Sequence, residues 1–119
     1  MRDLLYSRGI GYLHFIQPTQ FFSTGKALSE EEQNFLSYSN ARYKNSVAHG
    51  YSSLINNINR LKKNKVNIYD ATTVFDKTQE TVYRDDCIHY TTTGSRIFTE
   101  FVAEKTFLSY ATSVKKALP

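Results

Sequence analysis

The sequence predicts an α/β fold in which parallel strands are flanked by helices. Two short runs rich in apolar and β-branched residues, 10–16 and 66–72, have the composition of strands. A long amphipathic segment separates them and a second one follows, so the order is strand, helix, strand, helix. That alternation is typical of a parallel sheet. At 119 residues, the chain has the length of a single domain, residues 1–119.

Local signals place the first strand and the long helix. The strand should end before Pro18, because proline cannot donate to a strand ladder. Ser29 and Glu32 have the spacing of a capping box, which predicts a helix start. A single helix over residues 29–63 would be unusually long. Gly50 is therefore expected to mark a bend or break, with a tolerated mid-helix glycine as the alternative. The predicted apolar face comprises Tyr43, Val47, Tyr51, Leu54, Ile55, Ile58 and Leu61.

The second half of the chain is predicted to contain a turn and a final helix. Residues 74–76 are expected to belong to a loop or short turn after the second strand, and residues 91–94 to open a final helix. One face of that helix is apolar and includes Ile97, Phe98, Phe101, Val102 and Leu108. Two parallel strands are too few to fill the space between these helices, because a stable sheet generally needs three or more. The remaining strands are expected upstream or on another chain.

Composition argues against several function classes and excludes others. The net charge is +4, but basic residues cluster only at 60–65, where they suit a helix C-terminus, so no nucleic-acid partner is expected. The single cysteine, Cys87, excludes an internal disulfide and a cysteine-rich zinc site. The three histidines lack ligand-like spacing, so neither a metal nor a cofactor is expected. No apolar run could span a bilayer and no signal peptide is evident, which leaves the localisation open.

The densest functional signal lies between the second strand and the last helix. Asp86 and His89 are three residues apart in this loop. In a turn, that spacing lets the carboxylate reach one imidazole nitrogen and leaves the other nitrogen free to act as a general base. The structural alternative is that His89 caps a turn while Asp86 binds backbone amides.

Asp86-Cys-Ile-His89, followed by Gly94, resembles the last conserved block of the SGNH (GDSL-type) esterase and lipase superfamily. Further stretches also resemble that family, and together they run from about Ile10 to Val102. The resemblance implies a partial three-layer SGNH-hydrolase (flavodoxin-like) fold that lacks its N-terminal strands. The supporting stretches are residues 16–19, 26–32 (Lys-Ala-Leu-Ser-Glu-Glu-Glu) and 66–76.

The resemblance also implies roles for two residues. His89 matches the general base, and Asp86 matches the acid that orients it, whereas Asp85 has the wrong spacing. The family's Gly-Asp-Ser nucleophile motif and its oxyanion motifs do not occur in this sequence. Alone, the chain is expected to be inactive, as the C-terminal part of a hydrolase of small-molecule, glycan or lipid esters. The nucleophile would come from a missing N-terminal half or a partner chain.

Two other functions stay open at this stage. One is a catalytically inactive SGNH-like scaffold that binds a partner or a carbohydrate. The other is a small basic nucleic-acid binder, which would bind with a strong salt dependence. Cys87 is expected to be a small buried side chain in the motif, with a thiolate nucleophile as the alternative.

Overall fold

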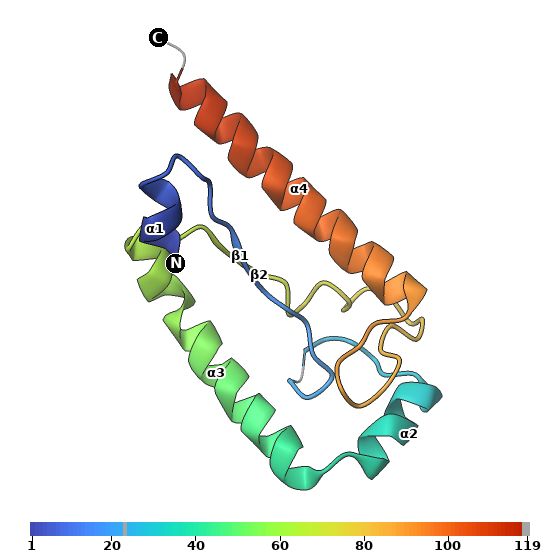
Figure 1. Cartoon of the computed structure of the whole chain (residues 1–119). Coiled ribbons are helices and arrows are strands. Elements are labelled where there is room, and N and C mark those ends of the chain that lie inside the picture. The colour runs from blue at the N-terminus through green and yellow to red at the C-terminus, as the bar shows by residue number, and fades with distance from the viewer. Residues whose placement is uncertain (23, 118–119) are drawn as a thin grey trace.

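The computed structural model of the chain describes residues 1–22 and 24–117, with side chains through Thr112. These residues form helices and two strands (Figure 1). In order, they are α1 (Arg2–Tyr6), β1 (His14–Ile16), α2 (Glu30–Tyr38), α3 (Ala41–Lys63), β2 (Ile68–Asp70) and α4 (Thr92–Ala117).

The predicted three-layer α/β fold is wrong. The structure is mostly helical, with 52% helix and 7% strand. Its described residues contain one sheet of two strands, which pair in parallel with His14 opposite Ile68 and Ile16 opposite Asp70. The order of strand, helix, strand and helix is confirmed, but the strands are too short and too few to make a layered sheet.

The strands are short because α3 ends only a few residues before β2 begins. Asn64 ends the helix, Lys65 adopts a left-handed conformation (φ 56°), and the Val66 amide donates to the Leu61 carbonyl at 3.0 Å. This helix-closing turn occupies the residues that a longer β2 would need. Residues 10–13 consequently have no strand opposite them, and β1 begins only at His14.

The long helical segment breaks before α3, and not at Gly50. The Asn40 side chain accepts hydrogen bonds from the amides of Arg42 at 2.9 Å and Tyr43 at 3.3 Å, which starts a new helix. Gly50 lies inside α3, so the alternative of a tolerated mid-helix glycine is confirmed. The capping box is confirmed as well, because Ser29 and Glu32 satisfy each other's backbone amides at the start of α2.

The helices α3 and α4 lie on opposite sides of the strand pair (Figure 1). On the α3 side, Ile16, Ile58 and Ile68 form a buried cluster. On the other face, the Phe15 ring meets the Phe101 ring of α4 edge-on, with centroids 6.3 Å apart. A second cluster lies under the loops before α4, and its buried members are Phe75, Val82 and Tyr83. Two small cores therefore replace the single core of a layered domain.

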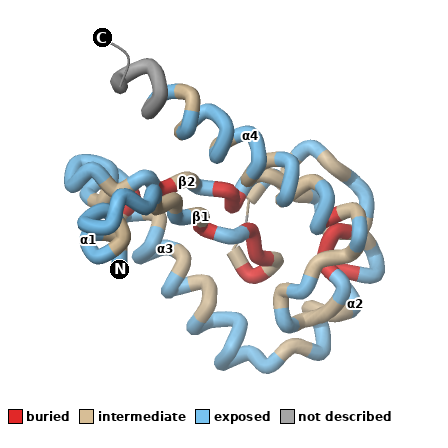
Figure 2. The backbone as a smooth tube through the Cα atoms, turned by 45° about the horizontal axis from the view of Figure 1, so that its top comes forward, coloured by how far each residue is buried: buried red, intermediate tan, exposed pale blue. Residues whose placement is uncertain are grey.

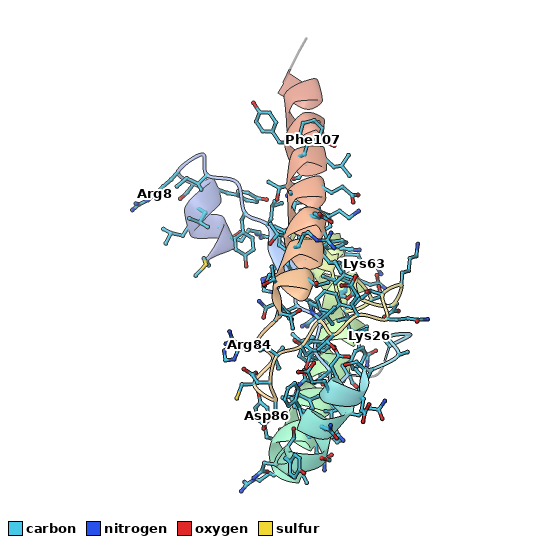
Figure 3. All side chains as sticks on the ribbon, turned by 90° about the vertical axis from the view of Figure 1, so that its right-hand side faces the viewer. Arg8, Lys26, Lys63, Arg84, Asp86 and Phe107 are labelled. Atoms are coloured by element: carbon cyan, nitrogen blue, oxygen red, sulfur yellow. The ribbon has the colours of Figure 1, made fainter. Side chains whose placement is uncertain are left out.

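The chain is elongated, with a radius of gyration of 16.7 Å, whereas a compact domain of this length has about 13.5 Å. Buried residues gather along the strands and in the loops near α2 (Figure 2). Phe107 lies on the part of α4 that extends beyond the remainder of the chain, and it is 70% exposed (Figure 3). Among the described residues, no helix combines the length and apolar character that a bilayer crossing requires.

Candidate functional site

The candidate site is the loop formed by residues 84–89, immediately before α4. Its two ends are tied together, because the Arg84 amide donates to the His89 carbonyl at 2.8 Å and Tyr83 pairs with Tyr90 in an antiparallel bridge. Below this bridge, the Thr91 amide donates to the Val82 carbonyl at 2.9 Å. The 84–89 loop is thus a closed turn on a short, hydrogen-bonded base.

Asp85, and not Asp86, contacts the histidine. The Asp85 Oδ2 atom lies 2.7 Å from His89 Nδ1, while Asp85 Oδ1 accepts from the amides of Cys87 at 2.9 Å and His89 at 3.3 Å. Asp86 Oδ1 instead accepts from Cys87 Sγ, at 3.7 Å. The expected contact between Asp86 and His89 is therefore corrected to Asp85.

The conformation of Ile88 explains the change of partner. Ile88 has a φ of 68°, a left-handed conformation that is a strong outlier for a β-branched residue. Its side chain packs on the second buried cluster, against Phe75 and its neighbours, and this packing holds the strained backbone in place. The reversal at Ile88 brings His89 back over the carboxylate four residues earlier, and not three.

One nitrogen of the His89 ring is held by a hydrogen bond, and the other is open to solvent. The His89 side chain is 62% exposed, and its Nε2 atom has no hydrogen-bond partner among the described residues. Burial alone would raise the pKa of Asp85, but the hydrogen bonds from the His89 ring and the amides of Cys87 and His89 outweigh it and lower that pKa. Asp85 is therefore an anion that holds the ring through Nδ1.

Cys87 is exposed, which corrects the expectation of a buried side chain. The neighbouring Asp86 carboxylate raises the pKa of the Cys87 thiol, because negative charge nearby disfavours the thiolate. Nucleophilic cysteines need the opposite environment, one that stabilises the thiolate. The surroundings of Cys87 therefore argue against a thiolate nucleophile at this position.

Two contacts fasten the 84–89 loop to the segment that follows β1. The Gln20 side chain donates through Nε2 to the Asp85 carbonyl at 2.8 Å. The Tyr90 hydroxyl donates to the Pro18 carbonyl at 2.9 Å. Sequence reasoning missed Gln20 and Tyr90 because their partners lie 65 and 72 residues away, and no local motif signals such pairs.

A buried carboxylate supports the base of the loop from the other side. Glu32 accepts hydrogen bonds from the amides of Val82 at 2.8 Å and Tyr83 at 3.1 Å, and from the capping-box amide of Ser29 at 2.8 Å. Its counter-ion is Lys26 Nζ, 3.1 Å away, and the two side chains are only 1% and 4% exposed. Burial alone would raise the pKa of Glu32, but these hydrogen bonds lower it below its ordinary value.

The Lys26 ammonium, like the Glu32 carboxylate, has several hydrogen-bond partners. Besides Glu32, it donates to the carbonyls of Ala27 at 2.8 Å and Glu80 at 3.1 Å. The pair joins the start of α2 to residues 80–83, which lead directly into the 84–89 loop. The Lys26 and Glu32 positions of the sequence motif are therefore structural, and they position the candidate site.

Gly94 is required by close packing at the start of α4. A Cβ atom at this position would overlap the carbonyl oxygen of Val82, which accepts the Thr91 amide. Gly94→Ala is expected to lower the free energy of unfolding by about 1–3 kcal/mol, because the backbone must shift. Urea denaturation measures this change.

Gly50→Ala is the matched control for Gly94→Ala. A Cβ at Gly50 meets nothing within 4 Å. Alanine in the middle of α3 should therefore stabilise the chain by about 0.5–1 kcal/mol. Equal effects of the two substitutions would contradict the packing argument.

The remaining histidines lie away from the loop. His14 is exposed at the start of β1, with Nδ1 3.1 Å from the Tyr12 hydroxyl, and His49 is exposed on α3, with Nδ1 2.8 Å from the Asn45 carbonyl. In the described ranges, no group of three histidine, cysteine, aspartate or glutamate side chains could hold a metal ion.

Comparison with protein-family models, curated proteins and solved structures finds no match to this chain. The resemblance to SGNH hydrolases accordingly depends on the motifs in the sequence. The function is inferred from those motifs and from the geometry of the 84–89 loop.

Proposed function

We propose that this chain provides the acid–base part of a serine ester hydrolase of the SGNH type. His89 is the general base, and a carboxylate of the 84–89 loop orients it. The nucleophilic serine and the oxyanion donors come from polypeptide outside these residues, since their motifs are not in this sequence. The observation that carries the proposal is the 2.7 Å contact from His89 Nδ1 to Asp85, together with an open Nε2.

The proposed chemistry follows from this geometry. His89 Nε2 takes the proton of the serine hydroxyl as the serine oxygen attacks the ester carbonyl, and the imidazolium then protonates the departing alcohol. Water repeats the sequence on the acyl-enzyme and releases the acid. Asp85 stabilises the imidazolium and fixes its tautomer through Nδ1. The substrate would be a small-molecule, glycan or lipid ester, as the resemblance implies.

A fluorophosphonate probe tests the proposal, because it reacts covalently with an activated serine. The protein would be expressed from its native coding region, with all contiguous coding sequence, as wild type, His89→Ala and His49→Ala. We expect labelling of the wild type and of His49→Ala, and none of His89→Ala. His49 is the control because it is an exposed histidine on α3, away from the loop. Labelling that does not depend on His89, or no labelling at all, would overturn the proposal.

A second candidate function is an inactive SGNH-like scaffold that binds a partner or a carbohydrate. It is favoured by the observation that no hydroxyl contacts His89 Nε2 within the described residues. This candidate predicts a cooperative unfolding transition of the 119-residue chain together with absence of fluorophosphonate labelling.

A further inference from the structure

The outer edge of β1 presents main-chain groups that have no partner strand. The His14 amide donates to the Asn67 carbonyl at 2.8 Å, so His14 directs its main-chain groups toward β2. Successive residues of a strand direct these groups to opposite edges. Leu13 and Phe15 therefore direct theirs away from β2, and the described residues contain no third strand to pair with them.

The β1 edge lacks the features that usually protect a free strand edge. Proteins protect such edges with charged side chains, proline, bulges, short strands or a covering element. Residues 9–17 contain no aspartate, glutamate, lysine or arginine, and proline occurs only after them. The outer edge of β2 differs, because that strand has three residues, carries Asp70 and closely follows Lys65. The β1 edge is therefore the one that is open to another strand.

Exposed apolar side chains lie beside this edge. A hollow of about 680 Å³ lies between residues 9–13 and α4, and its lining includes Ile10, Leu13 and Tyr110. Ile10 is 49% exposed and Tyr110 is 69% exposed. The helix α1, which stands out from the strands and α4 in Figure 3, adds Leu4, which is 62% exposed. A strand that pairs with β1 would bring further apolar side chains against this surface and remove it from water.

A second copy of the chain has the complementary edge. In antiparallel pairing about a two-fold axis at His14, Leu13 of each copy lies opposite Phe15 of the other, so the outward amides and carbonyls pair with one another. The net charge of +4 does not oppose this contact, because the dense basic cluster lies at residues 60–65 and not on the edge. A partner recognised through charge would need charged residues on the edge, and residues 9–17 offer no aspartate, glutamate, lysine or arginine.

We propose that the chain forms a homodimer in which the outer edges of two β1 strands pair in antiparallel orientation. The two sheets then join into one of four strands, in the order β2-β1-β1-β2, which exceeds the three strands that a stable sheet generally needs. His14 faces His14 of the second copy at the centre of the interface. The dimer uses neither His89 nor the 84–89 loop, so its failure would leave the proposed hydrolase function untouched.

Sedimentation equilibrium of the 119-residue chain tests the dimer. We expect the average mass to rise from 13.7 kDa toward twice that value as the concentration increases from about 1 µM to about 1 mM. A mass of 13.7 kDa throughout would overturn the proposal. Masses that continue to grow beyond the dimer would overturn it as well, because a two-fold contact leaves no free β1 edge for a third copy.

Charge variants at His14 test the position of the two-fold axis. His14→Lys places two ammonium groups opposite each other, and His14→Glu places two carboxylates, so each should raise the dimer dissociation constant about fivefold. An equal mixture of the two variants should associate more tightly than either alone, because opposite charges then face each other. His49→Lys is the matched control, since His49 is also exposed but lies on α3. A mixture no tighter than its components, or an equal effect of His49→Lys, would contradict the pairing.

A proline variant tests the main-chain contact. Leu13→Pro removes the outward amide and should raise the dissociation constant at least about tenfold, because the dimer loses two hydrogen bonds. A single chain loses none, since the Leu13 amide has no acceptor among the described residues. Leu13→Val keeps the amide and should dimerise as the wild type does. Circular dichroism checks that both variants keep the wild-type fold, and equal dissociation constants for the two would overturn the proposal.

Discussion

Glu32→Ala is expected to lower the free energy of unfolding by about 3–5 kcal/mol, because it leaves the buried Lys26 ammonium without its counter-ion. The same substitution removes the acceptor of three backbone amides, those of Ser29, Val82 and Tyr83. Small domains have a total stability of only about 5–15 kcal/mol, so most of the chain should unfold or become marginally stable. Urea or thermal denaturation followed by circular dichroism measures the loss.

Glu31→Ala is the matched control for this prediction. Glu31 is the preceding glutamate of α2, and its side chain is exposed. Surface substitutions of this kind change stability by about 0.5 kcal/mol or less. If Glu31→Ala and Glu32→Ala destabilised the chain equally, the buried ion pair would not be what holds residues 80–83 in place.

The lowered pKa of Glu32 also predicts the direction of the pH dependence. A carboxylate whose pKa is lower in the folded state stabilises the fold above its unfolded pKa, about 4.3. This contribution is lost as the pH falls from that value through the lower folded pKa. The wild type should therefore lose stability on acidification below pH about 5 more steeply than Glu32→Gln, which has no carboxylate at this position. Equal slopes in the two proteins would contradict this linkage.

Asp85→Asn is expected to lower the fluorophosphonate labelling rate of the proposed hydrolase by about 10⁴-fold, the effect of the same change in a serine protease triad. The amide can present an N–H group to His89 Nδ1, which would leave the histidine in the wrong tautomer. Asp86→Asn should cost less than about tenfold, because Asp86 contacts Cys87 and not His89. The two substitutions are chemically the same and affect adjacent residues. Labelling reactions stopped at a series of times therefore compare their rates directly.

The comparison of Asp85→Asn with Asp86→Asn decides which carboxylate orients His89. The spacing in the sequence assigns the orienting role to Asp86, whereas the geometry assigns it to Asp85. A larger effect of Asp86→Asn would restore the Asp86 assignment and refute the Asp85 contact as the functional one. Small effects of both substitutions would remove any carboxylate from the proposed mechanism.

Short-range signals in the sequence were reliable because their physical causes are local. The capping box of Ser29 and Glu32 involves residues three apart, and the side-chain oxygens find amides within one helical turn. The break before α3 has a local cause too, in the Asn40 cap, although Gly50 was the residue expected to mark it. A glycine only permits a bend, whereas an asparagine that accepts two amides stabilises a new helix start.

The sequence by itself determined the order of strands and helices, the start of α2 and the loop that carries His89. The tertiary structure decided the extent of the sheet, the partner of His89 and the second role of Glu32. Each of these depends on groups that meet only when distant segments pack together, such as Glu32 with Val82 or Gln20 with Asp85. Ile88 shows the reason most directly: its half-buried side chain packs against the cluster under the loop, and this contact accompanies the backbone reversal that brings His89 to Asp85.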